Sequence, residues 1–432
     1  MLTFTKIWVG QLVSTIGSYM SVFALMIWLW DATGSATTLA LVTFFSQLPR
    51  LIITPFAGAI VDKFNRKQLM LLGDVAAAIC TLVVGLLYWQ GWLQVWHLYG
   101  VVAIYGCFGQ LQTLAYSTSV ALLVSKENYT RAESMVAAVN YAGAVFSPIL
   151  AGSLYPLVGL TGIITIDLAT FSVAFITLTL AKIPQVKQSD TQSESVTFSW
   201  QDLTFGFRYI WQKPSLLAMA IAFTLFAIPS DIGKALYNPM ILARSGGDAQ
   251  VLGLVTTAAG IGGVVGAILV SVTGGFKQRI HGMLLGFAAT GLFKVSLAVG
   301  QTPFVWMGAH FAATLTIPLF YSSSNAIWYA KVPPALQGRV LAADQMIGLG
   351  VGAIAPLVAG PLADYVFEPA MQSDSLLARI FSPLFGQTPG SGMALLYALT
   401  ALAMAAVGMA GYGVRDLRQV ETLLPDHEET AT

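Results

Sequence analysis

The sequence predicts an all-α membrane protein with twelve transmembrane helices in two pseudo-symmetric six-helix bundles. Of its 432 residues, 56% are hydrophobic and only 9% are charged, and the mean hydropathy is +0.73. Such a chain is too apolar for an ordinary water-soluble core. The apolar residues form twelve runs of about 20 residues, the length that crosses a bilayer as a helix, and the second six runs repeat features of the first.

Each predicted span is helical, because lipid offers backbone groups no partner and the runs lack the alternation of barrel strands. The first six spans are predicted at residues 7–30, 37–61, 68–90, 95–118, 134–157 and 160–182. The second six are predicted at residues 215–242, 250–273, 282–301, 303–330, 340–366 and 392–414. The expected domains are therefore an N-terminal bundle at 1–182, a linker at 183–214, a C-terminal bundle at 215–414 and a tail at 415–432.

The linker interrupts the apolar pattern with a polar, flexible segment from Lys187 to Ser195. After it, Ser199-Trp-Gln-Asp202 is typical of a helix start, and aromatic residues follow, so we predict a short interfacial helix before Pro214. The segment at about residues 367–391 is the one long loop expected on the opposite side of the membrane, where we expect a surface flap.

The distribution of charge predicts the orientation of the chain. Sixteen of the 21 Lys and Arg residues lie before the first span, in the linker, or in the loops that follow the second, fourth, eighth, tenth and twelfth spans. This bias predicts that both termini are cytoplasmic. A net charge of only +1 gives no basic surface for nucleic acid. Cys80 and Cys107 lie in apolar runs, which favours packing residues over a disulfide or a metal site.

An internal repeat supports the two-bundle prediction. Three residues recur at a displacement of 208, and these are Arg131, Pro148 and Gly152, matched by Arg339, Pro356 and Gly360. A match without gaps indicates two parallel bundles related by an axis along the membrane normal.

A short charged run, Gly58-Ala-Ile-Val-Asp-Lys-Phe-Asn-Arg-Lys67, separates the second and third spans. It resembles the loop between these spans in the major facilitator superfamily, with Asn65 where the usual pattern has Gly. The segment from Ser323 to Arg339 is similar to the end of the tenth span in macrolide-efflux-like members of the drug:proton antiporter-3 family. The Arg often found in the fourth span of other drug antiporters is missing from residues 103–109.

The resemblance implies the facilitator fold in a bacterial inner membrane, and a transporter that works by alternating access. We expect proton-coupled efflux of an amphipathic small molecule, such as a macrolide-like drug or a siderophore. The expected partners are the lipid bilayer, protons and this substrate. We expect a monomer that binds no nucleic acid, metal or cofactor.

Charged residues at the predicted cytoplasmic rim are interpreted as a gate or latch that forms and breaks as the transporter closes and opens. The predicted gate residues are Gly58, Asp62, Arg66, Lys67, Asp74, Arg131, Arg339 and Asp344.

A second group resembles the Gly-rich, proline-containing signature of antiporter branches of the superfamily. Pro148 removes a backbone hydrogen bond, whereas Gly143 and Gly152 allow a neighbouring helix to approach closely. With the matching Pro356 and Gly360, the pattern predicts a seam that bends or slides. A structural kink with no bearing on transport direction is the alternative.

Charges inside spans are functional candidates, because a charge in hydrocarbon is costly unless it faces a partner or water. Asp231 and Lys234 lie three residues apart on one helix face, either as a proton-binding site or as a satisfied ion pair. Arg50 is a further candidate for proton coupling or for an acidic substrate. Asp167 and Lys294 are predicted to form helix-packing pairs outside the cavity.

If spans 1, 4, 7 and 10 line the cavity, as the resemblance implies, aromatic and amide side chains offer an amphipathic ligand mainly apolar contacts. The predicted lining residues are Tyr19, Phe23, Gln110, Gln112, Phe226, Tyr321 and Asn325.

Other functions fit the same features. One is a lipid or lysolipid transporter, or a uniporter without proton coupling, and another is a membrane sensor or scaffold that has lost transport. An enzyme is disfavoured, since the sequence contains no set of nucleophile, base and oxyanion donors and no metal-ligand spacing.

Overall fold

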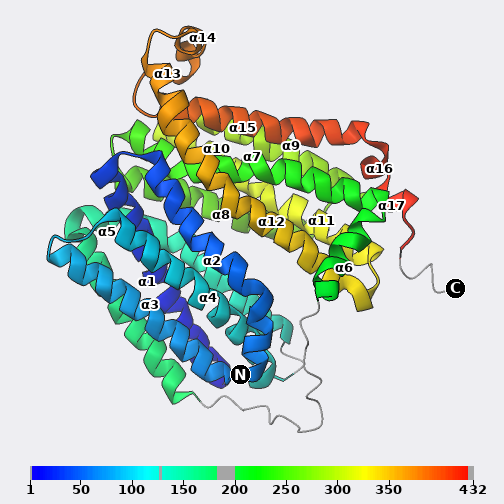
Figure 1. The fold of residues 1–432 in the computed structure, drawn as a ribbon, viewed down its shortest axis with the longest axis horizontal. Helices are drawn as coiled ribbons and strands as arrows, with labels where there is room; N and C mark the ends of the chain where they lie inside the picture. The colour runs from blue at the N-terminus through cyan, green and yellow to red at the C-terminus, as the bar shows by residue number, and fades with distance from the viewer. Residues whose placement is uncertain (1, 126–128, 182–199, 427–432) are drawn as a thin grey trace. The chain divides into compact units, whose positions relative to one another are not determined.

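A computed structural model describes residues 2–125, 129–181 and 200–426 (Figure 1). Within this range the chain is almost entirely helical and forms two compact units. Unit 1 holds the helices up to residue 181 together with residues 247–257, and unit 2 holds residues 200–246 and 258–426. The described residues contain no β-strand, which confirms the predicted all-α class.

Unit 1 is built from five helical elements, α1 (Leu2–Thr33), α2 (Ala36–Lys63), α3 (Arg66–Trp89), α4 (Val95–Leu123) and α5 (Tyr129–Leu180). Local sequence explains the short turns between them. Ser35 caps α2, since its side chain accepts a hydrogen bond from the Thr38 backbone N–H. Asn65 likewise caps α3 by accepting from Lys67 N and Gln68 N. Asn65 itself has an extended backbone, so the turn does not use the left-handed conformation that Asn tolerates.

The element α5 is two helices that meet at Gly159. Gly159 has φ of 63° and ψ of −173°, a conformation that only glycine adopts readily. Before this residue, the Trp8 indole N–H donates to Met135 O, and Ser147 Oγ donates to Ile16 O. The contact residue on α5 moves from 135 to 147 as its partner on α1 moves from 8 to 16, so the first half of α5 runs parallel to α1.

The second half of α5 runs in the opposite direction. Thr177 lies against Gly10, and Thr170 lies against Gly17, so one residue number falls as the other rises. Eleven segments of the described chain are long and apolar enough to cross a membrane, and one of them covers Ser134–Leu180. Because this segment folds back at Gly159, it contains the two helices predicted as the fifth and sixth spans up to residue 180.

We expect Gly159→Ala to destabilise unit 1, since a side chain is strained at this backbone conformation. The expected loss is about 1–3 kcal/mol, measured as a lower thermal unfolding midpoint in detergent. Gly100→Ala is the matched control, because Gly100 lies in α4, has an ordinary backbone conformation, and a Cβ there would have no neighbour within 4 Å. Equal midpoints for the two variants would contradict the assignment of a strained turn.

Unit 2 begins with the short helix α6 (Trp200–Trp211), which confirms the helix predicted after the linker. The long helices are α7 (Pro214–Ser245), α8 (Ala249–Thr273), α9 (Arg279–Val299), α10 (Pro303–Leu315), α11 (Ile317–Lys331), α12 (Pro334–Leu362) and α15 (Ser391–Ala410). The first part of α8 belongs to unit 1 and the rest to unit 2. Phe226, Phe287 and Trp328 are among the buried side chains at the core of unit 2.

The predicted tenth span is divided between α10 and α11. The break falls at Thr316, two residues before Pro318, which has no N–H to continue the ladder. The Thr316 hydroxyl donates to Ala313 O at 2.8 Å and lies 2.5 Å from the Thr290 hydroxyl of α9.

The predicted surface flap contains two short helices, α13 (Glu368–Gln372) and α14 (Leu376–Phe385), which follow a π-helical turn at Ala363–Phe367 (Figure 1). The Glu368 carboxylate accepts hydrogen bonds from the backbone N–H groups of Gly390 and Met393. It therefore caps the start of α15 and ties the flap to unit 2.

The C-terminal segment of the described chain packs on unit 2 through α16 (Arg415–Arg418) and α17 (Val420–Leu423). Lys331, only 4% exposed, forms an ion pair with Asp426 at 2.8 Å and donates to Glu421 O at 2.7 Å. The Glu421 side chain accepts from Ile280 N at the start of α9. The segment thus joins the last turn of α11 to the first turn of α9.

Candidate functional site

A buried carboxylate lies two turns into α3 of unit 1. Asp74 is 2% exposed, and the Gln112 amide of α4 donates a hydrogen bond to its Oδ1. Gln11 of α1 approaches the same carboxylate, although its amide nitrogen and Asp74 Oδ2 both fall outside hydrogen-bond geometry. A Cβ at Gly73 would lie 2.7 Å from Gln112 Cβ, so glycine is what lets α4 bring this amide close.

The cation inside α2 has an amide partner. Arg50 is exposed, and its Nε donates to Gln110 Oε1 of α4 at 2.7 Å. Among the residues that the structure describes, no carboxylate lies within ion-pair distance of Arg50. The two predicted cavity amides thus have distinct contacts, since Gln110 holds Arg50 and Gln112 holds Asp74.

Unit 2 gathers one carboxylate and two ammonium groups within electrostatic range of one another. Asp231 of α7 interacts with Lys234 on its own helix and with Lys294 of α9. Lys294 is only 9% exposed, whereas Lys234 is exposed. No pair within 4 Å forms among these three, so the carboxylate is not locked into one close ion pair in the part of the chain described.

Two further polar groups of unit 2 adjoin this charge cluster, which we define as Asp231, Lys234 and Lys294. Tyr321 of α11, 49% exposed, interacts electrostatically with both Asp231 and Asp344 of α12. A Cβ at Gly352 of α12 would lie 3.5 Å from Asp231 Oδ2, so the carboxylate faces a helix surface without a side chain. Four helices therefore surround one carboxylate.

Lys294 was expected in a helix-packing pair outside the cavity, and the structure places it within electrostatic range of Asp231. A lone charge in an apolar span marks a residue as a functional candidate. The sequence offered no indication that α9 would turn this side chain toward Asp231. For Gly352, the sequence shows only a glycine, and for Gln11 it shows only a polar side chain in the first span. Neither observation predicts contact with a buried carboxylate.

The basic residues after α2 do not contact Asp74. Arg66 donates to Thr118 O near the end of α4 at 3.1 Å, and Lys67 Nζ donates to Thr179 O and Ala181 O at 2.8 and 2.7 Å. Lys67 thus binds carbonyls at the C-terminal end of α5, where a positive charge is favourable.

The predicted latch between Asp74 and Arg66 is therefore absent from the described contacts. The physical reason is distance, since eight residues of helix place the two about 12 Å apart along the axis. Gly58 and Asp62 lie in α2, but their surroundings fall outside the described part of the structure. Arg131 is exposed at the start of α5.

The second predicted rim arginine contacts the short helix of unit 2. The Arg339 guanidinium lies over the Phe205 ring, 5.6 Å from its centroid. A Cβ at Gly206 would meet Arg339 O at 2.3 Å, so α6 packs on α12 without an intervening side chain. Asp344, five residues further along α12, interacts with Tyr321.

The proline and glycine pattern in α5 marks two close helix contacts in unit 1. A Cβ at Gly143 would lie 2.8 Å from the Tyr19 ring, and one at Gly152 would lie 2.7 Å from Ala249 O. From the other side, a Cβ at Gly253 would lie 2.5 Å from Pro148 O. The start of α8 and α5 therefore touch through their backbones. Pro356 and Gly360 are buried in α12.

The predicted cavity-lining aromatics fall into two groups. Tyr19 is 40% exposed, and Tyr321 and Asn325 are also exposed. Phe226, in contrast, is 3% exposed and stacks on Phe287 with ring centroids 3.9 Å apart, so it belongs to the core of unit 2. Phe23 is likewise buried, at 6% exposure. Both side chains are thus packed in the interior of their units in this structure.

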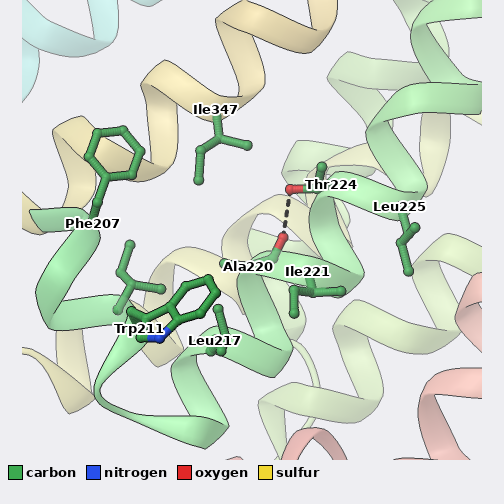
Figure 2. Close-up of a pocket in the computed structure, with 9 residues that line it drawn as sticks. Phe207, Trp211, Leu217, Ala220, Ile221, Thr224, Leu225 and Ile347 are labelled. Atoms are coloured by element: carbon green, nitrogen blue, oxygen red, sulfur yellow. Dashed lines mark hydrogen bonds between the residues drawn. The ribbon is translucent and has the colours of Figure 1, made fainter.

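Unit 2 also has an apolar cavity of about 350 Å³ between α6, α7 and α12 (Figure 2). Figure 2 shows Trp211, Leu217 and Ile347 around it. The Thr224 hydroxyl donates to Ala220 O, which leaves its methyl group as the contact surface. The lining residues offer apolar contacts, and none of them belongs to the charge cluster. Across the described ranges, no three His, Cys, Asp or Glu side chains gather as metal ligands would.

Comparison with known proteins identifies the family. A model of the Major Facilitator Superfamily matches residues 7–356. The chain belongs to this superfamily. Among its facilitator relatives, Macrolide efflux protein A of Streptococcus pyogenes is 27% identical over 346 residues, covering 78% of this chain and 84% of the relative. Multidrug efflux pump Tap of Mycolicibacterium fortuitum is 22% identical over 345 residues, covering 77% of this chain and 82% of the relative.

A solved structure agrees with this facilitator assignment at the level of the fold. The crystal structure of the nucleoside transporter NupG has a TM-score of 0.71, covers 94% of this chain and 99% of its own, and is 13% identical. The protein is thus a multi-pass membrane transporter of the facilitator fold and not an enzyme.

Proposed function

We propose that this protein exports an amphipathic small molecule, a macrolide-like drug or a siderophore, in exchange for protons. Its similarity to Macrolide efflux protein A and Multidrug efflux pump Tap, over most of both chains, supports export and an amphipathic substrate. The basic ends of the spans support an orientation in the bacterial inner membrane with both termini in the cytoplasm.

The observation that carries the proposal is the charge cluster of unit 2. Asp231 has two ammonium groups in electrostatic range but no close ion pair with either, and an apolar span surrounds it. Because a charged residue in such an apolar setting is costly, its presence indicates a function. Protonation of Asp231 removes the negative charge that offsets Lys294. Proton binding therefore changes the electrostatic potential at the site and, in this proposal, the affinity for substrate.

The transport cycle that we propose uses alternating access of the two units. Asp231 takes a proton when it is open to the outside and releases it to the cytoplasm, and substrate then binds. Within unit 2, Tyr321 beside Asp344 supplies polar contacts near Asp231, and within unit 1, Arg50 held by Gln110 supplies a cation. The lipid bilayer is the remaining partner, and the transporter acts as a monomer.

We expect purified protein in liposomes to accumulate radiolabelled erythromycin when the lumen is more acidic than the outside. An ionophore that collapses the pH gradient should abolish the accumulation, and substrate addition should release lumenal protons. Substrate movement that ignores the gradient would identify a uniporter instead. Movement of a fluorescent lysolipid but no macrolide would support lipid transport, and the absence of any flux would support a sensor or scaffold.

A further inference from the structure

A second buried carboxylate of unit 1 has a different environment from Asp74. Asp167, in the second half of α5, is 3% exposed. Ser18 Oγ of α1 donates to its Oδ1 at 3.2 Å, and Thr81 Oγ1 of α3 donates to its Oδ2 at 3.1 Å. Both carboxylate oxygens are therefore bound by hydroxyl groups from neighbouring helices.

A third hydroxyl points at the same carboxylate without completing a hydrogen bond. Ser21 is 5% exposed, and its Oγ is directed at Asp167 but has no partner within hydrogen-bond geometry. A buried hydroxyl without a partner is unfavourable, so such a group calls for an explanation. A small ligand bound between these oxygens would supply the missing partner.

No cation balances this carboxylate among the described residues. The titratable group near it is Tyr105 of α4, whose hydroxyl adjoins Ser18 and which also interacts electrostatically with Tyr19 and Asp74. In the described part of the chain, no basic side chain lies within ion-pair distance of Asp167. A bare carboxylate inside a span costs several kcal/mol, which favours occupation of the site by a positive ion.

We propose that Asp167, Ser18, Ser21 and Thr81 form a binding site for a monovalent cation, either a proton or Na⁺. Hydroxyl oxygens suit both ligands, because each donates to a carboxylate, accepts from a carboxylic acid, or turns its lone pairs to a hard cation. A single carboxylate balances one positive charge, which disfavours a divalent ion. Gly17 leaves the space open, since a Cβ there would lie 3.2 Å from Asp167 Oδ1.

The site gives unit 1 a cation ligand of its own, in addition to Asp231 of unit 2. A role in driving export rests on the proposed function, whereas binding of the cation does not. The test therefore uses two readouts that need no transported substrate. A failure of macrolide export would leave both of them interpretable.

The first readout is infrared difference spectroscopy of the purified protein during a pH titration. If a proton is the ligand, we expect a C=O stretching band of a protonated carboxyl group that Asp167→Asn removes. The second readout is the thermal unfolding midpoint in Na⁺ against K⁺ at constant ionic strength. If Na⁺ is the ligand, it should stabilise the wild type and not Asp167→Asn. Asp374→Asn, at an exposed position of the flap, is the control for both.

Ser21→Ala keeps the experiment decisive if Asp167→Asn fails to fold. Because Ser21 has no hydrogen bond to lose, a purely structural role for the cluster predicts no change in either readout. A cation site predicts a shifted band midpoint, or about tenfold weaker stabilisation by Na⁺, the size of one hydrogen bond to a charged group. A carboxylate that stays ionised throughout, together with equal behaviour in Na⁺ and K⁺, would overturn the proposal.

Discussion

Asp231→Asn is expected to abolish uphill export while leaving the protein folded. The amide has nearly the same shape as the carboxylate but cannot bind and release a proton, and it no longer offsets Lys234 and Lys294. We expect pH-driven substrate accumulation in liposomes to fall by about 100-fold, the lower end of what a positioned proton-transfer group contributes in enzymes.

Substrate counterflow provides the sharpest control for this variant. Exchange of labelled for unlabelled substrate needs both conformations of the transporter but no net proton movement, so Asp231→Asn should retain it. Asp248→Asn, at an exposed carboxylate that caps α8, controls for the loss of charge alone. Undiminished accumulation by Asp231→Asn would rule out Asp231 as the coupling residue and would point to Asp167 or Asp74.

Gly152→Val is expected to have the second largest effect. A Cβ at this position would lie 2.7 Å from Ala249 O, and a neighbouring Gly253 Cα would lie 3.3 Å away, so α5 and the start of α8 must separate. Overpacking of this kind costs about 1–3 kcal/mol. If only one transport state uses this contact, the balance between states moves by about 5–150-fold and turnover falls accordingly.

Gly263→Val is the matched comparison on α8, because a Cβ at Gly263 would have no neighbour within 4 Å. We expect it to transport at close to the wild-type rate. The measurement is the initial rate of efflux together with cysteine accessibility from each side of the membrane. Equal rates and equal labelling for the two variants would show that the α5 contact is a passive kink.

The sequence was sufficient for the fold because the bilayer imposes a simple rule on it. A run of about 20 apolar residues must become a helix, so the apolar runs located the spans, and α1 and α12 begin five or six residues before the predicted spans. The fold-back at Gly159 was located to within a few residues, as the gap between two runs. Its backbone conformation was not foreseeable from composition.

The candidate site was only partly predictable, because helical periodicity does not say which neighbouring helix a residue meets. Asp231 and Lys234 were found together since they share a helix. Lys294 approaches Asp231 from another helix, α9, which the order of the sequence does not show. The stacking of Phe226 on Phe287 of α9 was unforeseeable for the same reason. Asp167 was read as a packing residue because its hydroxyl neighbours come from separate spans.

The docked C-terminal segment has a mechanical consequence for unit 2. Lys331 at the end of α11 and Ile280 at the start of α9 are both fastened to residues 421–426. These contacts hold the neighbouring ends of α9 and α11 together and oppose their separation. Flexure of this half during a cycle therefore concentrates at the interruption by Thr316, where the backbone ladder is already open.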